Sequence, residues 1–276
     1  MKFNKEIISK TLIYIFLIFG SFVMIFPFLW MFLSSFKTMQ EVIVFPPKLF
    51  PSHISFENYK KAFSMAPFGR YFFNSVVVMI GSVCCTTTTS ILAAFAFSRL
   101  KFLGKSVIFS FLISLMMIPF EMLIMTNYTT IVKLNLFNTL PALLLPFVAS
   151  IFYTYILKNF FDTVSDSLYY SARIDGASNW KYLWRILVPL AKPSIFTIVL
   201  LNALSSWNSF MWPLYITSDF HSRTLPYGLQ VFTTEAGSFQ ELLMAASTII
   251  VLPMILLFIF ARKYIVNGVA HGGLKG

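Results

Sequence analysis

Charged residues are scarce in this chain. Only 11% of its 276 residues are Asp, Glu, Lys or Arg, whereas 58% are hydrophobic and the mean hydropathy is +0.78. A soluble domain of this size would have to bury far more apolar side chain than its few charges allow. The composition therefore excludes a soluble protein and predicts an integral membrane protein.

Cysteine and histidine are also rare, and their positions exclude several kinds of site. The only cysteines, Cys84 and Cys85, are adjacent, so no disulfide framework is expected. The three histidines are far apart, and neither H-E-x-x-H, a Cys/His metal spacing nor G-x-S-x-G occurs. Asp162 and Asp166 are spaced to share a helical face at a membrane edge, where we expect them to face solvent. We therefore predict no catalytic residues and no metal site, hence no enzyme.

A complete nucleotide-binding loop is missing as well. Gly104, Lys105 and Ser106 read G-K-S, the end of a phosphate-binding loop, but the glycine needed five residues earlier is Arg99. The chain itself is thus expected to bind neither ATP nor another cofactor. Its energy source must be another protein or a gradient.

Long apolar runs, in contrast, are abundant. Flanking charges delimit six of them, at residues 11–36, 71–98, 106–132, 134–157, 193–218 and 242–261, and only the third contains a charge, Glu121. Each reaches the ~20 residues that a helix needs to cross the hydrocarbon core, where backbone groups must be satisfied within the segment. The prediction is an all-α integral membrane protein with six transmembrane helices. Prolines break the segment 37–70 between the first two, and residues 56–63 are expected to form a short interfacial helix there.

The distribution of basic residues indicates the orientation in the membrane. If the N-terminus is cytoplasmic, inside segments hold 14 of the 21 basic residues, namely Lys2, Lys5, Lys10, Arg99, Lys101, Lys105, Lys158, Arg173, Lys181, Arg185, Lys192, Arg262, Lys263 and Lys275. This arrangement places residues 1–10, the loop 165–193 and the tail 263–276 in the cytoplasm and residues 37–70 outside. The pI near 9.7 thus reports topology rather than binding of nucleic acid.

The loop 165–193 is the most strongly patterned polar stretch of the C-terminal half. Gly176 stands where a first short helix would end, because glycine adopts the left-handed conformation at low cost. Trp180, Leu183, Trp184 and Leu187 then recur at helical spacing and predict one apolar helix face. Pro189 and Pro193 are expected to end that helix.

The string A-R-I-D-G-A at 172–177, followed by tryptophans and two prolines, resembles the coupling (EAA) loop of permease subunits of ATP-binding-cassette (ABC) importers. The family's Glu-Ala-Ala falls on Tyr170, Ser171 and Ala172, so its glutamate is replaced here. The resemblance implies that the loop docks on an ATPase subunit through residues of this segment, namely Tyr170, Ser171, Ala172, Asp175, Gly176, Ala177, Trp180 and Trp184.

Further strings resemble the maltose-type second permease of carbohydrate importers. They are S-S-F-K-T-x-x-E at 34–41, E-N-Y at 57–59, M-I-P-x-E at 117–121 and the C-terminal tail. The resemblance implies a type I ABC importer permease fold with a transmembrane core at 71–262, in a bacterial plasma (inner) membrane. The implied partners are a homologous permease, two cytoplasmic ATPase subunits that bind ATP and Mg²⁺, an external solute-binding protein and membrane lipid.

Four residues are candidates for a substrate path. Trp207 and Asn208 lie in W-N-S-F-M-W-P-L at 207–214, where aromatic rings stack on sugars and an amide binds hydroxyls, although an aromatic interface belt is the alternative. Asn202 is nearer the membrane midplane, where the belt does not explain it. Glu121 either faces an aqueous cavity or snorkels to the headgroups.

These observations favour one function over several alternatives. The predicted function is a permease subunit of a binding-protein-dependent importer, for a sugar or oligosaccharide, that forms half of the pathway. The same type of permease carrying glycerol phosphate or another polar solute remains open. A gradient-driven carrier has only Glu121 in its favour, since the two halves show no repeat.

Overall fold

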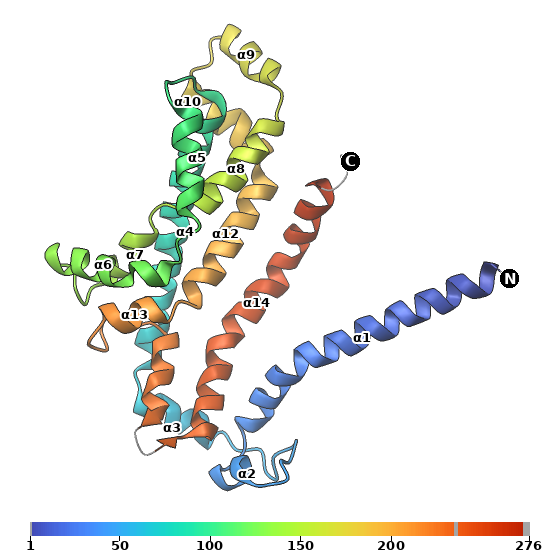
Figure 1. Ribbon diagram of the computed structural model, residues 1–276. Helices are drawn as coiled ribbons and strands as arrows, with labels where there is room; N and C mark the ends of the chain where they lie inside the picture. The colour runs from blue at the N-terminus through green and yellow to red at the C-terminus, as the bar shows by residue number, and fades with distance from the viewer. Residues whose placement is uncertain (1, 235–236, 273–276) are drawn as a thin grey trace. The chain divides into compact units, whose positions relative to one another are not determined.

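The computed structural model describes residues 2–234 and 237–272 (Figure 1). Within these residues the protein is helical apart from one two-stranded antiparallel hairpin, in which Thr233 pairs with Ser238 and Thr234 with Gly237. The chain divides into two compact units, Met1–Phe68 with Gly228–Pro253 and Gly69–Tyr227 with Met254–Gly276. The last residues of the predicted cytoplasmic tail, 273–276, lie outside the described residues.

The first unit begins with the long helix α1 (Lys2–Ser34), followed by α2 (Met39–Ile43) and α3 (Glu57–Met65). The C-terminal part of the chain contributes the 3₁₀ segment η3 (Pro226–Phe232), the strands β1 (Thr233–Thr234) and β2 (Gly237–Ser238), and the start of α14 (Gln240–Gly272). Helix α3 confirms the short helix expected near residues 56–63. The apolar side chains of α1 are largely exposed, as lipid-facing residues of a membrane helix are.

The strings S-S-F-K-T-x-x-E at 34–41 and E-N-Y at 57–59 contact each other in this unit. The Asn58 side-chain amide donates to the carbonyls of Ser35 and Lys37, at 2.8 and 2.7 Å. The Tyr59 and Ser35 hydroxyls are 2.7 Å apart. Lys37 Nζ donates to the Lys48 carbonyl at 2.6 Å and lies over the Trp30 ring. Side chains of the E-N-Y string thus satisfy backbone carbonyls at the end of α1, which have no partner within the helix.

Removing the Asn58 amide should destabilise the first unit. In Asn58→Ala the buried carbonyls of Ser35 and Lys37 lose their donor, and each unsatisfied group costs about 1–3 kcal/mol. We expect unfolding in detergent to become easier by about 2–4 kcal/mol in total, measured by denaturant titration. Lys61→Ala on the same helix is the control, because its 3.8 Å ion pair with Glu57 is exposed and worth little. Equal effects of the two substitutions would contradict the assignment.

The capping of α2 shows how the chain is held just after α1. Thr38 and Glu41 form a reciprocal capping box, and Glu41 also accepts the backbone N–H of Ser52 at 2.9 Å. Hydrogen bonds from Ser52 and Thr38 lower the pKa of the Glu41 carboxyl to about 2. The three-residue spacing of Thr38 and Glu41 is therefore the signature of a helix start.

The second unit contains the remaining helices. They are α4 (Phe68–Arg99), α5 (Lys105–Leu115), α6 (Phe120–Lys133), α7 (Leu140–Leu144) with the 3₁₀ turn η1 (Leu145–Phe147), α8 (Ile151–Thr163), α9 (Asp166–Ile174), α10 (Asn179–Tyr182), the π turn η2 (Leu183–Leu187), α11 (Val188–Leu190), α12 (Lys192–Trp207) and α13 (Met211–Ile216). The end of α14 also belongs to it.

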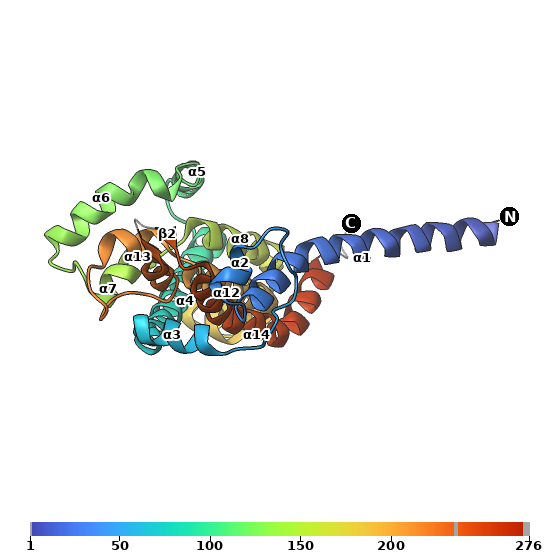
Figure 2. The ribbon, with the colours of Figure 1, turned by 90° about the horizontal axis from the view of Figure 1, so that it is seen from below.

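Three helices are long and apolar enough to cross a membrane without a break, at Ser9–Ser34, Phe68–Arg99 and Gln240–Phe260. Three bent pairs of helices are further candidates if each pair is counted as one span: α5 meets α6 at 99°, α7 and η1 meet α8 at 46°, and α10–α11 meets α12 at 79°. The first of these bends is visible in Figures 1 and 2. Pro119 is the N-cap of α6, where the chain turns. The third apolar run, expected as one helix over 106–132, is therefore two helices.

Candidate functional site

The loop 165–193 contains a helix whose end has a defined geometry. Helix α9 begins at the N-cap Ser165 and is closed by Gly176, which has φ = +77°. The Ala177 N–H donates to the Ala172 carbonyl and the Gly176 N–H to the Arg173 carbonyl, the two hydrogen bonds of a Schellman motif. Ala172 and Ala177 are both buried in the same apolar cluster. The string A-R-I-D-G-A thus encodes this turn, as the glycine position predicted.

The apolar face observed after this turn differs in part from the predicted one. Tyr182, Leu183 and Leu187 are buried, whereas Trp184 is half-buried and Trp180 is 63% exposed. Trp180 lies in the first turn of α10, before the π turn at Leu183–Leu187, and its side chain points away from the apolar cluster that buries Leu183 and Leu187. The predicted face of Trp180, Leu183, Trp184 and Leu187 is therefore wrong at Trp180.

The predicted docking residues consequently fall into two groups. Tyr170, Ser171, Asp175, Gly176 and Trp180 are exposed, whereas Ala172 and Ala177 lie in the core of the turn. Exposed apolar side chains lie beside the first group, and among them Ile174 is 86% exposed. Exposed aromatic and aliphatic side chains on a short, well-defined turn are suited to contact another protein.

The two carboxylates Asp162 and Asp166 do not share a helical face as predicted. Asp162 lies on α8, where it accepts hydrogen bonds from Lys158 Nζ at 2.6 Å and from the Ser98 hydroxyl at 2.7 Å. Asp166 lies on α9 and accepts from Arg99 at 3.0 Å. The chain leaves the helix between them at Val164 and Ser165, which have extended backbone angles. The predicted shared face is therefore wrong, whereas both carboxylates are exposed as expected, and each also has a cationic partner.

The G-K-S string has a structural place. Gly104, with φ = +76°, is the N-cap of α5. Lys105 Nζ donates to the carbonyls of Ser98 and Leu100, at 3.0 and 3.2 Å. Lys105 therefore satisfies carbonyls at the C-terminal end of α4, where a cation is favourable.

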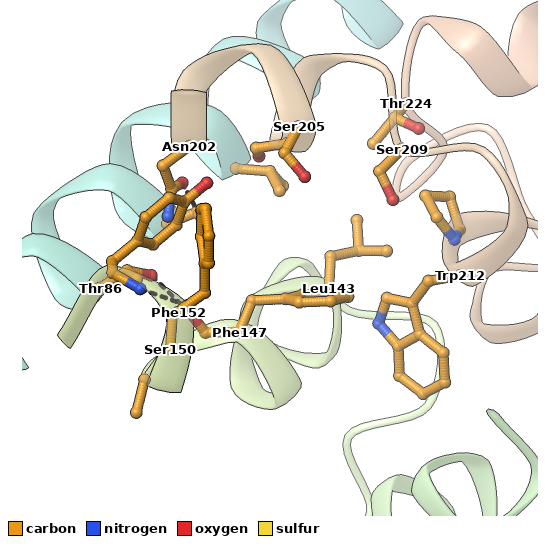
Figure 3. Close-up of a pocket in the computed structure, with 16 residues that line it drawn as sticks. Thr86, Leu143, Phe147, Ser150, Phe152, Asn202, Ser205, Ser209, Trp212 and Thr224 are labelled. Carbon is orange, nitrogen blue, oxygen red and sulfur yellow. Dashed lines mark hydrogen bonds between the residues drawn. The ribbon is translucent and has the colours of Figure 1, made fainter. Parts of the chain in front are cut away.

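A cavity of about 250 Å³ lies within the second unit (Figure 3). Asn202, Ser205, Ser206 and Ser209 line it from α12 and the turn that follows, at the i, i+3, i+4, i+7 spacing of one helix face. The other lining residues are Val78, Ser82, Thr86, Leu143, Phe147, Ala149, Ser150, Phe152, Tyr153, Trp212, Pro213 and Thr224. No Asp, Glu, Lys, Arg or His is among these residues. The cavity wall thus combines hydroxyl, amide and aromatic groups with aliphatic side chains such as Leu143 and Val78.

Hydrogen bonds fix several of these groups. The Ser82 hydroxyl donates to Asn202 Oδ1 at 2.9 Å, and Asn202 Nδ2 has no partner within the described part of the chain. The Thr86 hydroxyl donates to the Phe147 carbonyl, and Trp212 Nε1 to the Ala142 carbonyl at 3.0 Å. The buried Thr224 hydroxyl finds no acceptor among the described residues. An amide and a hydroxyl are therefore available to a polar solute.

Only one of the four predicted path residues lines this cavity. Asn202 does so, whereas Trp207 is buried, and the centroids of the Trp207 and Phe72 rings are 5.7 Å apart. Asn208 is exposed just after α12, and Glu121 is exposed in the first turn of α6. The serines of α12 were missed, although their spacing relative to Asn202 was readable in the sequence. Ser82 and Thr86 were missed because they lie on α4, which is far from α12 in the sequence and comes close to it only in the folded chain.

Apolar helices of membrane-spanning length, a cavity without charged residues and a turn with exposed apolar side chains are features expected of a membrane permease. The chain belongs to the family described as binding-protein-dependent transport system inner membrane component, whose model matches residues 86–271. It is therefore an inner-membrane, multi-pass permease subunit of a binding-protein-dependent ABC importer. Its role is transport rather than catalysis, and the family implies an ATPase and a binding protein as partners.

Individual relatives agree with the family. The chain is 31% identical to the arabinooligosaccharides transport system permease protein AraQ of Halalkalibacterium halodurans, over 100% of both chains. It is 34% identical to the trehalose/maltose transport system permease protein MalG of Thermococcus litoralis, over 99% of both chains. Its fold matches a chain of a bacterial ABC transporter involved in the import of the acidic polysaccharide alginate, with a TM-score of 0.82, 22% identity and coverage of 94% and 97%. The type I ABC importer permease fold is thus confirmed.

Proposed function

We propose that this chain carries a neutral sugar or oligosaccharide across the membrane and forms half of the pathway together with a homologous permease. The observation that carries the proposal is the cavity beside Asn202, because hydroxyl and amide groups bind sugar hydroxyls while aromatic rings stack on the apolar faces of sugars. Relatives named for arabinooligosaccharides and for trehalose and maltose support the same substrate class.

The absence of charged residues from the cavity lining bears on the choice between a neutral saccharide and glycerol phosphate as the substrate. An anionic solute such as glycerol phosphate is normally held by Arg, Lys or helix N-termini, because removing its charge from water is costly. None of the cavity residues is a cation, and at the N-terminus of α8, which also lines the cavity, the Ser150 hydroxyl already accepts the Tyr153 N–H. The lining therefore favours a neutral solute over glycerol phosphate.

The energy for transport would come from ATPase subunits on the cytoplasmic side. In the proposed arrangement both termini and the loop 165–193 are cytoplasmic, as the distribution of basic residues favours. One of the two ATPase subunits, which hold ATP and Mg²⁺, docks on the exposed side chains around Tyr170, Ile174 and Trp180. Their closure on ATP turns the helices outward, an external binding protein delivers the solute, and hydrolysis returns the cavity to the cytoplasm.

A solute panel tests the substrate class. Cells that contain or lack this chain are given labelled neutral mono- and oligosaccharides and labelled glycerol 3-phosphate. We expect chain-dependent uptake of at least one neutral saccharide and none of the phosphate, because the cavity offers no cation. Uptake of the phosphate alone would overturn the neutral-solute proposal while leaving the membership of the importer family intact.

A further inference from the structure

The side chain of Arg99 joins three helices of the second unit. Arg99 is the last residue of α4 and its side chain is only 4% exposed. Nη2 donates to the carbonyls of Phe161 and Val164, each at 2.6 Å, and Nη1 donates to Asp166 Oδ1 at 3.0 Å. The two carbonyls lie at the C-terminal end of α8 and Asp166 in the first turn of α9.

The chemistry of this contact depends on a guanidinium. Carbonyls at a helix C-terminus have no partner within the helix, and a cation there is also favourable to the helix dipole. Only arginine presents several N–H donors in one rigid plane, so that carbonyls and a carboxylate are bound at the same time. A lysine ammonium at this position would not hold the three acceptors in a fixed geometry.

The position of Arg99 connects the loop with the cavity. Helix α4 runs without a break from Ser82 and Thr86, which line the cavity, to Arg99. The helix between Ser82 and Arg99 spans roughly 25 Å at 1.5 Å per residue. At one end of this rod Arg99 holds α9, and at the other Ser82 holds Asn202 of α12.

We propose that Arg99 is a positioning residue that transmits movement of α9 through α4 to the cavity, with Asp166 as the point of attachment. This inference rests on the proposed docking of an ATPase on the loop 165–193. When the ATPase subunits displace α9, the Arg99–Asp166 ion pair pulls the end of α4 with it. Without the ion pair, α9 moves but α4, which forms part of the cavity wall, does not move with it.

The matched variants are Asp166→Asn and Asp162→Asn. Asp166 is 71% exposed and Ser165 still caps α9, so the replacement removes the charge partner of Arg99 while an amide oxygen remains as an acceptor. Asp162→Asn weakens the contacts with Lys158 and Ser98 but leaves the attachment of α9 intact. Asp166→Glu retains the carboxylate and serves as the conservative rescue.

The measurement is the number of solute molecules moved per ATP hydrolysed by the complete transporter in proteoliposomes. We expect Asp166→Asn to copurify with the ATPase and to hydrolyse ATP within about twofold of wild type, while the solute-to-ATP ratio falls at least about fivefold. Asp162→Asn and Asp166→Glu should stay within about twofold of the wild-type ratio. A purely structural role would lower assembly, hydrolysis and uptake together.

Two outcomes overturn the inference: an unchanged ratio in Asp166→Asn, or an equal fall in Asp162→Asn. Either result, obtained with a wild-type complex that moves saccharide on ATP, leaves the proposed function standing. A wild-type complex that moves no saccharide contradicts the proposed function itself.

Discussion

Replacing Gly176 with valine should reduce uptake at least tenfold without reducing the amount of protein in the membrane. Gly176 has φ = +77°, and a Cβ built there meets nothing within 4 Å, so the penalty comes from the backbone alone. The left-handed conformation costs an ordinary L-residue about 1–2 kcal/mol, and a β-branched residue more. A penalty of about 2–3 kcal/mol shifts the equilibrium away from the closed form of the turn by about 30- to 140-fold. Initial uptake rate and immunoblotted membrane protein are the two measurements.

Two further variants separate backbone strain from other causes. Gly176→Asn should retain at least half of the uptake, since asparagine tolerates the left-handed region. Gly69→Val is the matched control, because a Cβ at Gly69 also meets nothing within 4 Å and its φ is not positive. Wild-type uptake in Gly176→Val would contradict the role of this turn. Loss of the variant from the membrane would instead make the turn a requirement for folding.

Replacing Asn202 with leucine should lower the maximum rate of uptake about tenfold. The change removes the free Nδ2 donor and the acceptor of the Ser82 hydroxyl, and a lost hydrogen bond of about 1.4 kcal/mol corresponds to a factor of ten. The half-saturation concentration should change little, because a binding protein captures the solute before it reaches the cavity. Uptake measured over a range of external concentrations separates the two constants.

Asn208→Ala is the comparison for Asn202→Leu. Asn208 is exposed and does not line the cavity, so we expect its replacement to stay within about twofold of wild type. A larger loss there than at Asn202 would place the solute path at the exposed end of α12. The double variant Ser82→Ala with Asn202→Leu leaves no unpaired serine, so normal membrane levels with low uptake would exclude misfolding as the cause.

The sequence allowed most of the fold to be predicted, because length and apolar composition are enough to locate membrane helices. The short helix α3 and the turn at Gly176 also followed from local signals. The bends did not, since a run such as 106–132 has the same composition whether straight or broken at Pro119. Hydropathy likewise cannot tell whether a residue such as Trp180 faces lipid, protein or water, because lipid is as apolar as a protein core.

The candidate site was predictable only in part. Asn202 was predicted because an amide near the midplane is unusual. The serines beside it were missed, although they follow the same helical period. Ser82, which lies 120 positions earlier in the chain, joins the site through a long-range contact. Arg99 was noticed as a basic residue next to an apolar run and as the residue in place of a phosphate-loop glycine, whereas its burial and its three acceptors are properties of the fold.

The most direct test of the account is a cross-link between α9 and the ATPase. Ile174→Cys, at a position 86% exposed, is introduced into a chain with Cys84 and Cys85 replaced by serine, and Phe45→Cys, in the segment proposed to be external, is the matched position. Native membranes that contain the complete transporter are treated with a short thiol-to-amine cross-linker. The account predicts a product of Ile174→Cys with the ATPase subunit and none from Phe45→Cys. The absence of that product, together with labelling of the Ile174→Cys thiol from outside intact cells by an impermeant reagent, would contradict it.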